Sequence, residues 1–144
     1  CLVLKSGYSG KCGLFDLSDG KQVIDFRYDD ITLLGFNRAL GKDGSRRYLL
    51  DTSTGDVIAS LPPNIGAAHF NETPVTWIFR AKSYYGIIDE EGNILYEDAK
   101  DPLTGVTKFR HGFSGGQKDN KKWGILKSDG TWLVHPAYDY IKLL

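Results

Sequence analysis

The chain has 144 residues, and its 18 basic and 18 acidic side chains argue against nucleic acid as the main partner, because phosphate binding normally leaves a basic excess. Apolar runs such as residues 31–34 are far shorter than the roughly 20 residues of a membrane-spanning helix, so we expect no membrane span. Two cysteines, Cys1 and Cys12, exclude a disulfide framework, and abundant glycine with 12% aromatic residues favours strands joined by tight turns.

Four glycine turns recur along the chain, at Gly20, Gly55, Gly92 and Gly130, with spacings of 35, 37 and 38 residues. Each turn lies between two short apolar runs. Because glycine supplies the positive φ that a tight hairpin turn requires, each turn predicts a β-hairpin. The paired runs are 12–15 with 22–24, 47–51 with 57–58, 85–89 with 94–95, and 123–127 with 132–134.

Another strand is expected upstream of each hairpin, which gives at least three strands in each repeated unit. After the first and fourth hairpins, the sequence Tyr-Asp-x-Ile at 28–31 and 138–141 predicts a fourth short strand or a crossover to the next unit. This closing element has decayed in the other two copies, at 61–65 and 101–106. The upstream strands are expected at 2–5, 38–40, 75–81 and 113–118.

The repeat predicts an all-β chain of four tandem three- to four-stranded antiparallel β units within one repeat domain, 1–144. Such units must bury their faces against neighbours, and a propeller-like ring achieves this. An open curved β-hairpin array is the alternative. In a ring, the first and last units would protect each other's strand edges. The approximate units are 1–34, 35–70, 71–108 and 109–144.

The fourth copy carries a recognisable motif. It reads Lys122-Trp123-Gly124-Ile125-Leu126, continues through the turn Asp129-Gly130, and closes with residues 135–141, His-Pro-Ala-Tyr-Asp-Tyr-Ile. This pattern resembles the bacterial WG repeat, in which lysine, tryptophan and glycine precede a short strand, a glycine turn and a proline-tyrosine-aspartate close. The resemblance extends over nearly the whole chain.

The other copies depart from the WG pattern at its defining positions. Cys12, Arg47 and Tyr85 replace the tryptophan, and Tyr48 replaces the glycine in the second copy. We therefore expect the second unit to be the most distorted. The resemblance implies a structural framework formed by Gly13, Gly20, Tyr28, Gly55, Gly86, Gly92, Trp123, Gly124, Gly130 and Tyr138.

Residues typical of catalysis or metal binding do not form a known motif. The three histidines, His69, His111 and His135, are far apart and have no partner at metal-ligand spacing, so we expect no metal site. Nucleophile, phosphate-loop and nucleotide motifs are also missing, which predicts a protein that is not an enzyme and has no cofactor.

Most aspartates recur at repeat positions, and a group needed once by an active site would not recur in this way. We interpret these aspartates as hydrogen-bond acceptors for the backbone of the turns. They are Asp16, Asp51, Asp89 and Asp139.

Neighbouring units carry opposite charge. Residues 71–108 contain four basic and seven acidic side chains, whereas residues 109–144 contain six basic and three acidic ones. One interpretation is a solvated surface that keeps a β-protein soluble. The other is a docking face for a basic partner, with candidate partner-binding residues Asp89, Glu90, Glu91, Glu97 and Asp98.

The repeat architecture and the missing catalytic motifs favour a non-enzymatic protein-binding module. The resemblance implies a bacterial immunity protein that binds and neutralises a cognate toxin, such as a basic nuclease. One alternative is an envelope or surface module that binds glycan or peptidoglycan through exposed Trp77, Tyr84 and Trp132. Another alternative is a structural fragment of a longer repeat protein.

We expect a monomer in the cytoplasm. A periplasmic protein is the alternative location, as is a lipoprotein if Cys1 is the mature N-terminus. Residues 2–4 look like a strand, which would leave no flexible tether between a lipid anchor and the fold.

Overall fold

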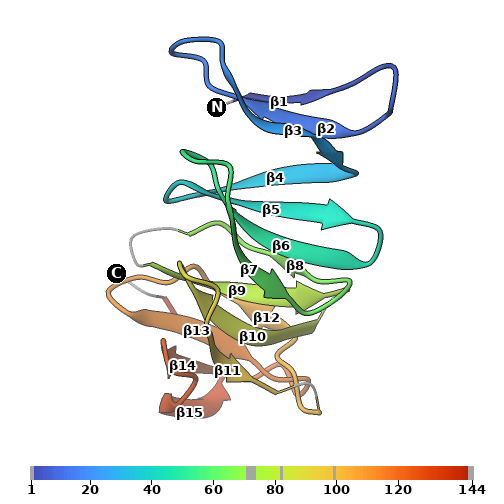
Figure 1. The fold of residues 1–144 in the computed structure, drawn as a ribbon. Helices are drawn as coiled ribbons and strands as arrows, with labels where there is room; N and C mark the ends of the chain where they lie inside the picture. Colours follow the sequence, from blue (N-terminus) through green and yellow to red (C-terminus); the bar gives the residue numbers. More distant parts are fainter. Residues whose placement is uncertain (1, 71–73, 82, 99, 143–144) are drawn as a thin grey trace. The chain divides into compact units, whose positions relative to one another are not determined.

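The computed structural model describes residues 2–70, 74–81, 83–98 and 100–142, and within these ranges it contains strands and no helix (Figure 1). In this described part of the chain, fifteen strands form four antiparallel sheets, and each strand pairs only with its neighbours in sequence. The predicted all-β chain of four three- to four-stranded antiparallel units is confirmed. The choice between a ring and an open array stays a prediction, and Cys1 lies outside the described residues.

Each of the four repeats forms one sheet. The four sheets fall into two larger compact units, Cys1–Asn64 and Ile65–Leu144, which are called the first and the second unit from here on. The first unit holds sheet 1 and sheet 2, and the second unit holds sheet 3 and sheet 4. Sheet 1 consists of β1 (Leu2–Lys5), β2 (Cys12–Phe15) and β3 (Gln22–Tyr28). Sheet 2 consists of β4 (Asp30–Gly35), β5 (Arg38–Asp43), β6 (Arg46–Asp51) and β7 (Val57–Leu61).

The second unit repeats this arrangement. Sheet 3 consists of β8 (Gly66–Ala67), β9 (Val75–Arg80), β10 (Ser83–Asp89) and β11 (Ile94–Glu97). Sheet 4 consists of β12 (Gly105–Val106), β13 (Phe113–Gln117), β14 (Trp123–Lys127) and β15 (Trp132–Tyr138). The expected upstream strands correspond to β1, β5, β9 and β13.

The Tyr-Asp-x-Ile element of the first copy is a crossover between two sheets. Tyr28 ends β3 of sheet 1, and Asp30 begins β4 of sheet 2. In the fourth copy Tyr138 likewise ends β15, and residues 139–141 form no strand. There Ile141 lies directly against Gly115, where a Cβ atom would collide with the Ile141 side chain.

All four hairpins have a glycine with positive φ in the turn and share the same irregularity, although the first two turns are one residue longer than the last two. The turn glycines Gly20, Gly55, Gly92 and Gly130 have φ values of 72, 82, 80 and 85°, which favour glycine. In each hairpin the register skips one residue on the second strand, a β-bulge that increases the local twist. The skipped residues are Val23, Ile58, Leu95 and Leu133.

The glycine of the WG motif lies opposite a three-residue bulge in the facing strand. In sheet 1 the register passes from Cys12↔Tyr28 to Leu14↔Ile24, so residues 25–27 bulge opposite Gly13. A Cβ atom on Gly13 would lie 2.7 Å from the Ile24 carbonyl oxygen, which leaves room only for glycine. In sheet 4 the equivalent bulge at 135–137 leaves no space for a Cβ atom on Gly124.

Tyr48 fits at the glycine position of the second copy because the strand that faces it has no such three-residue bulge. Tyr48 pairs regularly with Ser60, and the β6–β7 ladder contains one register shift, whereas β2–β3 and β14–β15 each contain two. The expectation that the second repeat is the most distorted is not met, because its sheet contains two register shifts, as does each of the other three sheets. Within sheet 2, the regular pairing at Tyr48 leaves space for its side chain.

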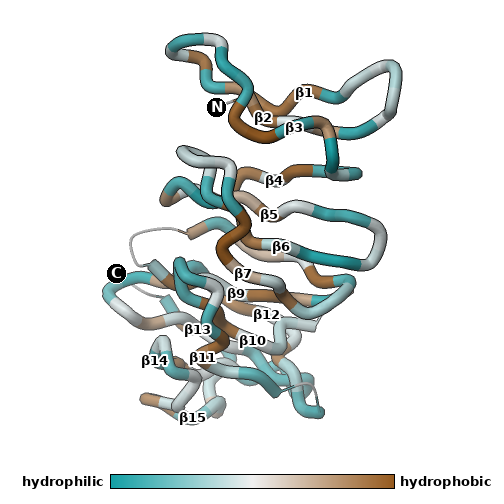
Figure 2. The backbone as a smooth tube through the Cα atoms, viewed as in Figure 1, coloured by the Kyte–Doolittle hydropathy of each residue, from teal (hydrophilic) through white to brown (hydrophobic). Residues whose placement is uncertain are grey.

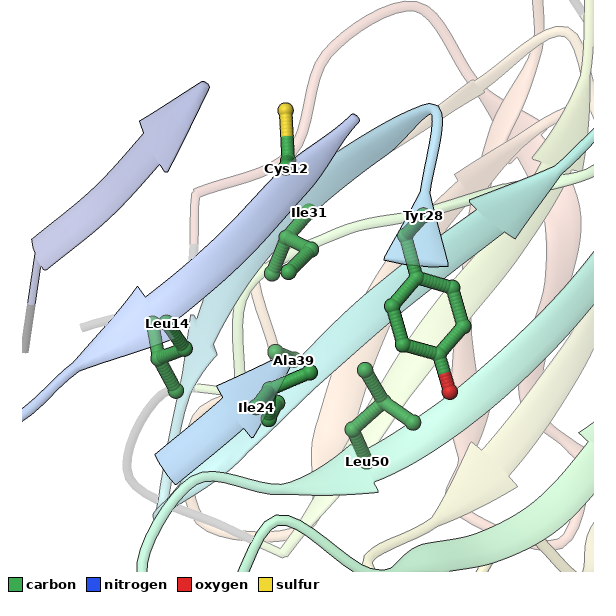
Figure 3. Close-up of a cluster of buried hydrophobic side chains, with 7 residues drawn as sticks. All are labelled: Cys12, Leu14, Ile24, Tyr28, Ile31, Ala39 and Leu50. Carbon is green, nitrogen blue, oxygen red and sulfur yellow. The ribbon is translucent and has the colours of Figure 1, made fainter. Parts of the chain in front are cut away.

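Each unit has an apolar cluster between its two sheets. In the first unit, Tyr28 lies over Gly41 of β5 and makes an edge-to-face contact with Tyr48, with ring centroids 6.2 Å apart. Burying large apolar side chains in this way is the main stabilising contribution to such small sheets. Figure 3 shows the buried members of the first cluster, Cys12, Leu14, Ile24, Tyr28, Ile31, Ala39 and Leu50.

The cluster of the second unit contains a stacked aromatic pair. Trp77 of β9 and Phe109 have ring centroids 5.6 Å apart with an interplanar angle of 23°, and both side chains are buried. Tyr96 of β11 meets Trp77 edge-on at 6.5 Å. The buried members are Val75, Trp77, Ile87, Leu103, Phe109 and Leu126.

Candidate functional site

The aspartates that precede the hairpin turns hold the turn backbone. Oδ1 of Asp16, Asp51 and Asp89 accepts the N–H of the residue two positions later, at 2.8 or 2.9 Å. The predicted role in the turns is confirmed for these three residues. Asp139 differs, because it pairs with the ammonium group of Lys122 instead of bonding to a turn.

The five candidate acidic residues lie at the two ends of β11. Asp89, Glu90 and Glu91 belong to the β10–β11 turn, whereas Glu97 and Asp98 lie where β11 ends. Glu97 pairs with Gly86, three residues before Asp89 on β10, so the two groups are separated by about 10 Å along the strand. The structure therefore places the candidates in two clusters on one hairpin.

Some of these carboxylates also organise the backbone. Asp89 accepts hydrogen bonds from both the backbone and the side-chain amide of Asn93, at 2.9 and 3.0 Å. Asp98 Oδ1 accepts the N–H groups of Lys100 and Asp101 at 3.2 and 3.0 Å. Glu91 and Glu97 are exposed, one at each end of β11, and are best placed to meet a partner.

Two exposed apolar side chains lie between the acidic clusters. Ile94 and Leu95 of β11 are 45% and 39% exposed, and they form an apolar stretch in Figure 2. β11 is the terminal strand of sheet 3 and pairs only with β10 among the described residues, so its other edge offers unpaired backbone groups. We call this surface the acidic edge, formed by Asp89, Glu90, Glu91, Ile94, Leu95, Glu97 and Asp98.

The charged surroundings of β11 differ from those of the equivalent strands. Asp29 follows β3 and Asp139 follows β15, and each pairs with a lysine of its own sheet's hairpin. These lysines, Lys11 and Lys122, occupy the same position immediately before the second strand of their sheets. At β11 the position after the strand carries Asp98, and acidic residues precede the strand as well.

A pocket of about 470 Å³ opens in the second unit, on the side of its apolar cluster. Trp77 and Phe109 contribute to its wall, and the exposed His69 and Lys108 lie at its rim. The Thr76 hydroxyl donates to the backbone carbonyls of this region. Sequence reasoning missed this pocket because its walls come from segments with no shared motif: Ala68, His69, Phe70, Thr76, Trp77, Tyr84, Val106, Thr107, Lys108 and Phe109.

The aromatic residues proposed for glycan stacking are not exposed together. Trp77 is only 2% exposed, and its indole N–H donates to Ser114 within the protein interior. Tyr84 and Trp132 are half-buried and pack against the same cluster. The expectation of an exposed platform that includes Trp77 is therefore wrong, because these rings fill the space between sheets 3 and 4.

The histidines do not come together in one site. His69 lies at the pocket, His111 occupies a turn with a φ of 53°, and His135 is an exposed residue of β15. No group of three or more His, Cys, Asp or Glu residues within 2–70, 74–81, 83–98 and 100–142 is arranged to hold a metal ion. The described part of the chain also contains no helix long and apolar enough to cross a membrane.

Comparison with known families identifies the repeat. The model of the WG containing repeat matches residues 123–143, the copy with the motif Lys122-Trp123-Gly124. The resemblance to the WG repeat is thereby confirmed for the fourth copy. No curated protein matches the chain.

Two solved structures align with the chain. The computationally designed Ika8 protein aligns with a TM-score of 0.54 and 12% identity, over 90% of this chain and 45% of the designed chain. BamB from Moraxella catarrhalis aligns with a TM-score of 0.47 and 17% identity, over 85% of this chain and 36% of BamB. The chain spans less than half the length of either structure. At 12% identity, the first similarity concerns the fold alone.

Proposed function

We propose that the chain is a non-enzymatic protein-binding module whose docking surface is the acidic edge. Its most specific role would be that of a bacterial immunity protein that binds and neutralises a cognate basic toxin, such as a nuclease, in the cytoplasm. The observation that carries this proposal is the exposed apolar pair Ile94 and Leu95 on a terminal strand, with acidic residues at both ends.

The backbone of β11 supplies the first part of the interaction. A terminal strand can extend its sheet by pairing with a strand of a partner, and the main-chain hydrogen bonds then provide affinity. Ile94 and Leu95 would bury their apolar surface in the same contact, at about 25 cal/mol for each Å² removed from water. A strand of this kind is a general binding element, so specificity must come from the charges around it.

The carboxylates would select a cationic partner. Acidic residues at both ends of the strand repel a second acidic edge, which disfavours pairing between two copies through β11. The same charges attract a basic surface and raise its association rate. A nuclease toxin must present basic side chains to nucleic-acid phosphates, and an acidic partner on that surface would exclude its substrate.

The glycan-binding alternative receives less support. Stacking on a sugar requires an exposed aromatic face, and the burial of Trp77 removes the central ring of the expected platform. The half-buried Tyr84 and Trp132 contribute to the packing of the second unit. A purely structural role within a longer repeat protein is compatible with the fold, but it gives no reason for acidic residues at both ends of β11.

Co-expression with the protein encoded by the neighbouring gene tests this function directly. We expect a stable stoichiometric complex, whose association rate at low salt is then measured for the original chain and for the double variant Glu91→Lys/Glu97→Lys. Both side chains are exposed, so the charge reversal should leave the fold intact. The association rate should fall roughly tenfold or more, and the difference should shrink as salt screens the charges.

A charge-matched control uses exposed aspartates that do not belong to the acidic edge. The variant Asp43→Lys/Asp119→Lys changes the net charge by the same amount, and both side chains are exposed. Its association rate should remain close to that of the original chain. An unchanged rate for Glu91→Lys/Glu97→Lys at low salt would contradict the assignment of the docking surface, and the failure to form any protein complex would contradict the binding role.

A further inference from the structure

The pocket of the second unit lies between sheet 3 and sheet 4. Its volume is about 470 Å³, and pockets that bind small molecules measure about 300–1,000 Å³. All of its lining residues fall within 68–109, so its walls belong to the second unit alone. The size of the pocket therefore fits a small organic ligand.

Hydrogen bonds hold both walls of this pocket in place. On the side of sheet 3, the Thr76 hydroxyl donates to the carbonyl of Ala68 at 2.8 Å, and the Ala68 N–H donates to the carbonyl of Trp77 at 2.9 Å. On the side of sheet 4, the Thr107 hydroxyl accepts the N–H of Gly115 at 2.7 Å. A site that is already ordered loses little conformational entropy when a ligand binds.

The interior of the pocket suits an apolar, flat group. The indole N–H of Trp77 already donates to Ser114, and the Ser114 hydroxyl lies 2.8 Å from the carbonyl of Thr107. Aromatic rings contact one another favourably in offset or edge-to-face arrangements, whereas a polar group buried without a hydrogen-bond partner is unfavourable. Four of the ten lining residues are aromatic: Phe70, Trp77, Tyr84 and Phe109.

The rim of the pocket is basic. His69 and Lys108 are both exposed, and none of the ten described lining residues is acidic. A lysine ammonium group attracts a carboxylate, and an imidazole can donate a hydrogen bond to it. An anionic group at the rim would therefore be attracted, and no carboxylate among the lining residues would repel it.

The two basic residues occupy the same position of the repeat. In sheets 2, 3 and 4, one residue of the second strand pairs with the residue directly before the register shift nearest the hairpin turn: Leu40, Trp77 and Gly115. Each of these has a partner on the preceding segment, and the residues that follow those partners are Leu33, His69 and Lys108. Because sheet 2 has the apolar Leu33 there, the fold itself does not require a basic residue. Both sheets that enclose the pocket have one.

We propose that this pocket binds a small aromatic carboxylate, with the ring of the ligand against Trp77 and Phe109 and its carboxylate at Lys108 and His69. The ring would displace water from the apolar wall, which is the main favourable contribution. The carboxylate would stay at the exposed rim, where it is attracted by the basic side chains without being buried. This pocket shares no residue with the acidic edge.

Calorimetric titration of the whole chain with cinnamate tests the site. We expect one cinnamate to bind each chain, with a Kd between about 10 μM and 1 mM, as is usual for a ligand of this size. Cinnamamide, which has the same ring and a neutral amide, should bind at least about twofold more weakly. In Lys108→Gln the Kd for cinnamate should rise about two- to fivefold, the effect of losing an exposed ion pair, while the Kd for cinnamamide stays the same.

Two further variants separate the pocket from general effects of charge. Val106→Phe adds a ring to the half-buried wall and should weaken the binding of both ligands. Lys127→Gln removes the same charge at an exposed lysine of β14 that does not line the pocket, and it should bind both ligands like the original chain. Urea midpoints equal to that of the original chain would show that each variant is folded.

Three results would overturn the proposal. They are a lack of cinnamate binding up to about 10 mM, equal affinities for cinnamate and cinnamamide, and an equal loss of cinnamate affinity in Lys108→Gln and Lys127→Gln. None of these measurements involves a protein partner. The ligand site therefore stands or falls separately from binding at the acidic edge.

Discussion

The indole N–H of Trp77 donates a 2.9 Å hydrogen bond to the hydroxyl oxygen of Ser114 and so links β9 of sheet 3 to β13 of sheet 4. Both side chains are buried, with exposed fractions of 2% and 0%. The Ser114 hydroxyl is also 2.8 Å from the backbone carbonyl of Thr107, to which it can donate. A polar chain therefore crosses the apolar cluster of the second unit.

Removal of the Ser114 hydroxyl should destabilise the protein. In Ser114→Ala the buried indole N–H loses its acceptor, and we expect the free energy of unfolding to fall by about 1–3 kcal/mol in urea titrations. The control is Ser60→Ala on β7, where the side chain is exposed and the change should remain within about 0.5 kcal/mol. Equal effects of the two substitutions would contradict a structural role for the hydrogen bond.

Two turn glycines should respond differently to alanine. Both have positive φ, 72° for Gly20 and 82° for Gly55, so each Gly→Ala change costs about 1–2 kcal/mol in backbone strain. Only at Gly55 does the new Cβ also collide with Val23 of the neighbouring sheet. Gly55→Ala should therefore lose at least about 2 kcal/mol more in the free energy of unfolding than Gly20→Ala, measured by urea titration. Similar losses would show that sheet 1 moves away from the turn at little cost.

The hydroxyl of Tyr85 should contribute little to stability. It is buried without a hydrogen-bond partner among the described residues, and burial raises the pKa of Tyr85, so the group stays neutral. Since a buried unsatisfied hydroxyl is unfavourable, Tyr85→Phe should leave the unfolding free energy unchanged or raise it by up to about 1 kcal/mol. Tyr140→Phe, at a side chain that is 76% exposed, should have no effect. A clear loss of thermal stability in Tyr85→Phe would reveal a partner for the hydroxyl.

The turn aspartate Asp51 should make stability depend on acid pH. Hydrogen bonds from the hydroxyl and backbone N–H of Ser53 hold the pKa of Asp51 below its usual range. This contribution is complete above the pKa of the unfolded chain, about 3.9, and is lost as pH falls through the lower folded pKa. Asp51→Asn should therefore be less stable than the original chain at pH 7, and the difference should shrink below about pH 4.

Urea titrations at several pH values would measure this change. Asp119→Asn is the control of equal charge, on an exposed side chain in the loop between β13 and β14. At pH 7 its free energy of unfolding should stay within about 0.5 kcal/mol of that of the original chain, because the side chain is exposed. A difference for Asp51→Asn that does not change with pH would show that the Ser53 hydrogen bonds do not favour the charged carboxylate.

Local sequence chemistry was enough to predict the repeated fold. Gly20 and its counterparts mark the turns because their backbone conformation excludes most other residues, and alternating apolar runs mark the paired strands. The tolerance of Tyr48 at a glycine position was unpredictable for the opposite reason. Whether a side chain fits there depends on how the facing strand arches, and that path is set by register shifts in a different segment.

The candidate site was predictable in composition but not in arrangement. The sequence places acidic residues on both sides of residues 94–96, and the hairpin turns them into two clusters joined by an exposed strand. The burial of Trp77 could not be read in the same way, because its partner Ser114 lies 37 residues away in the next sheet. An aromatic residue in a β-strand has the same local signature whether it faces solvent or a second sheet.

The pairing of every strand with its sequence neighbours has a consequence for the order of folding. Local pairings close short loops, so their entropic cost is small and they form faster than pairings between distant segments. Each sheet can therefore assemble as soon as its own last strand has been synthesised, without waiting for the end of the chain. The nascent protein would emerge from the ribosome as a series of completed hairpins, each of which gives the next one a surface on which to fold.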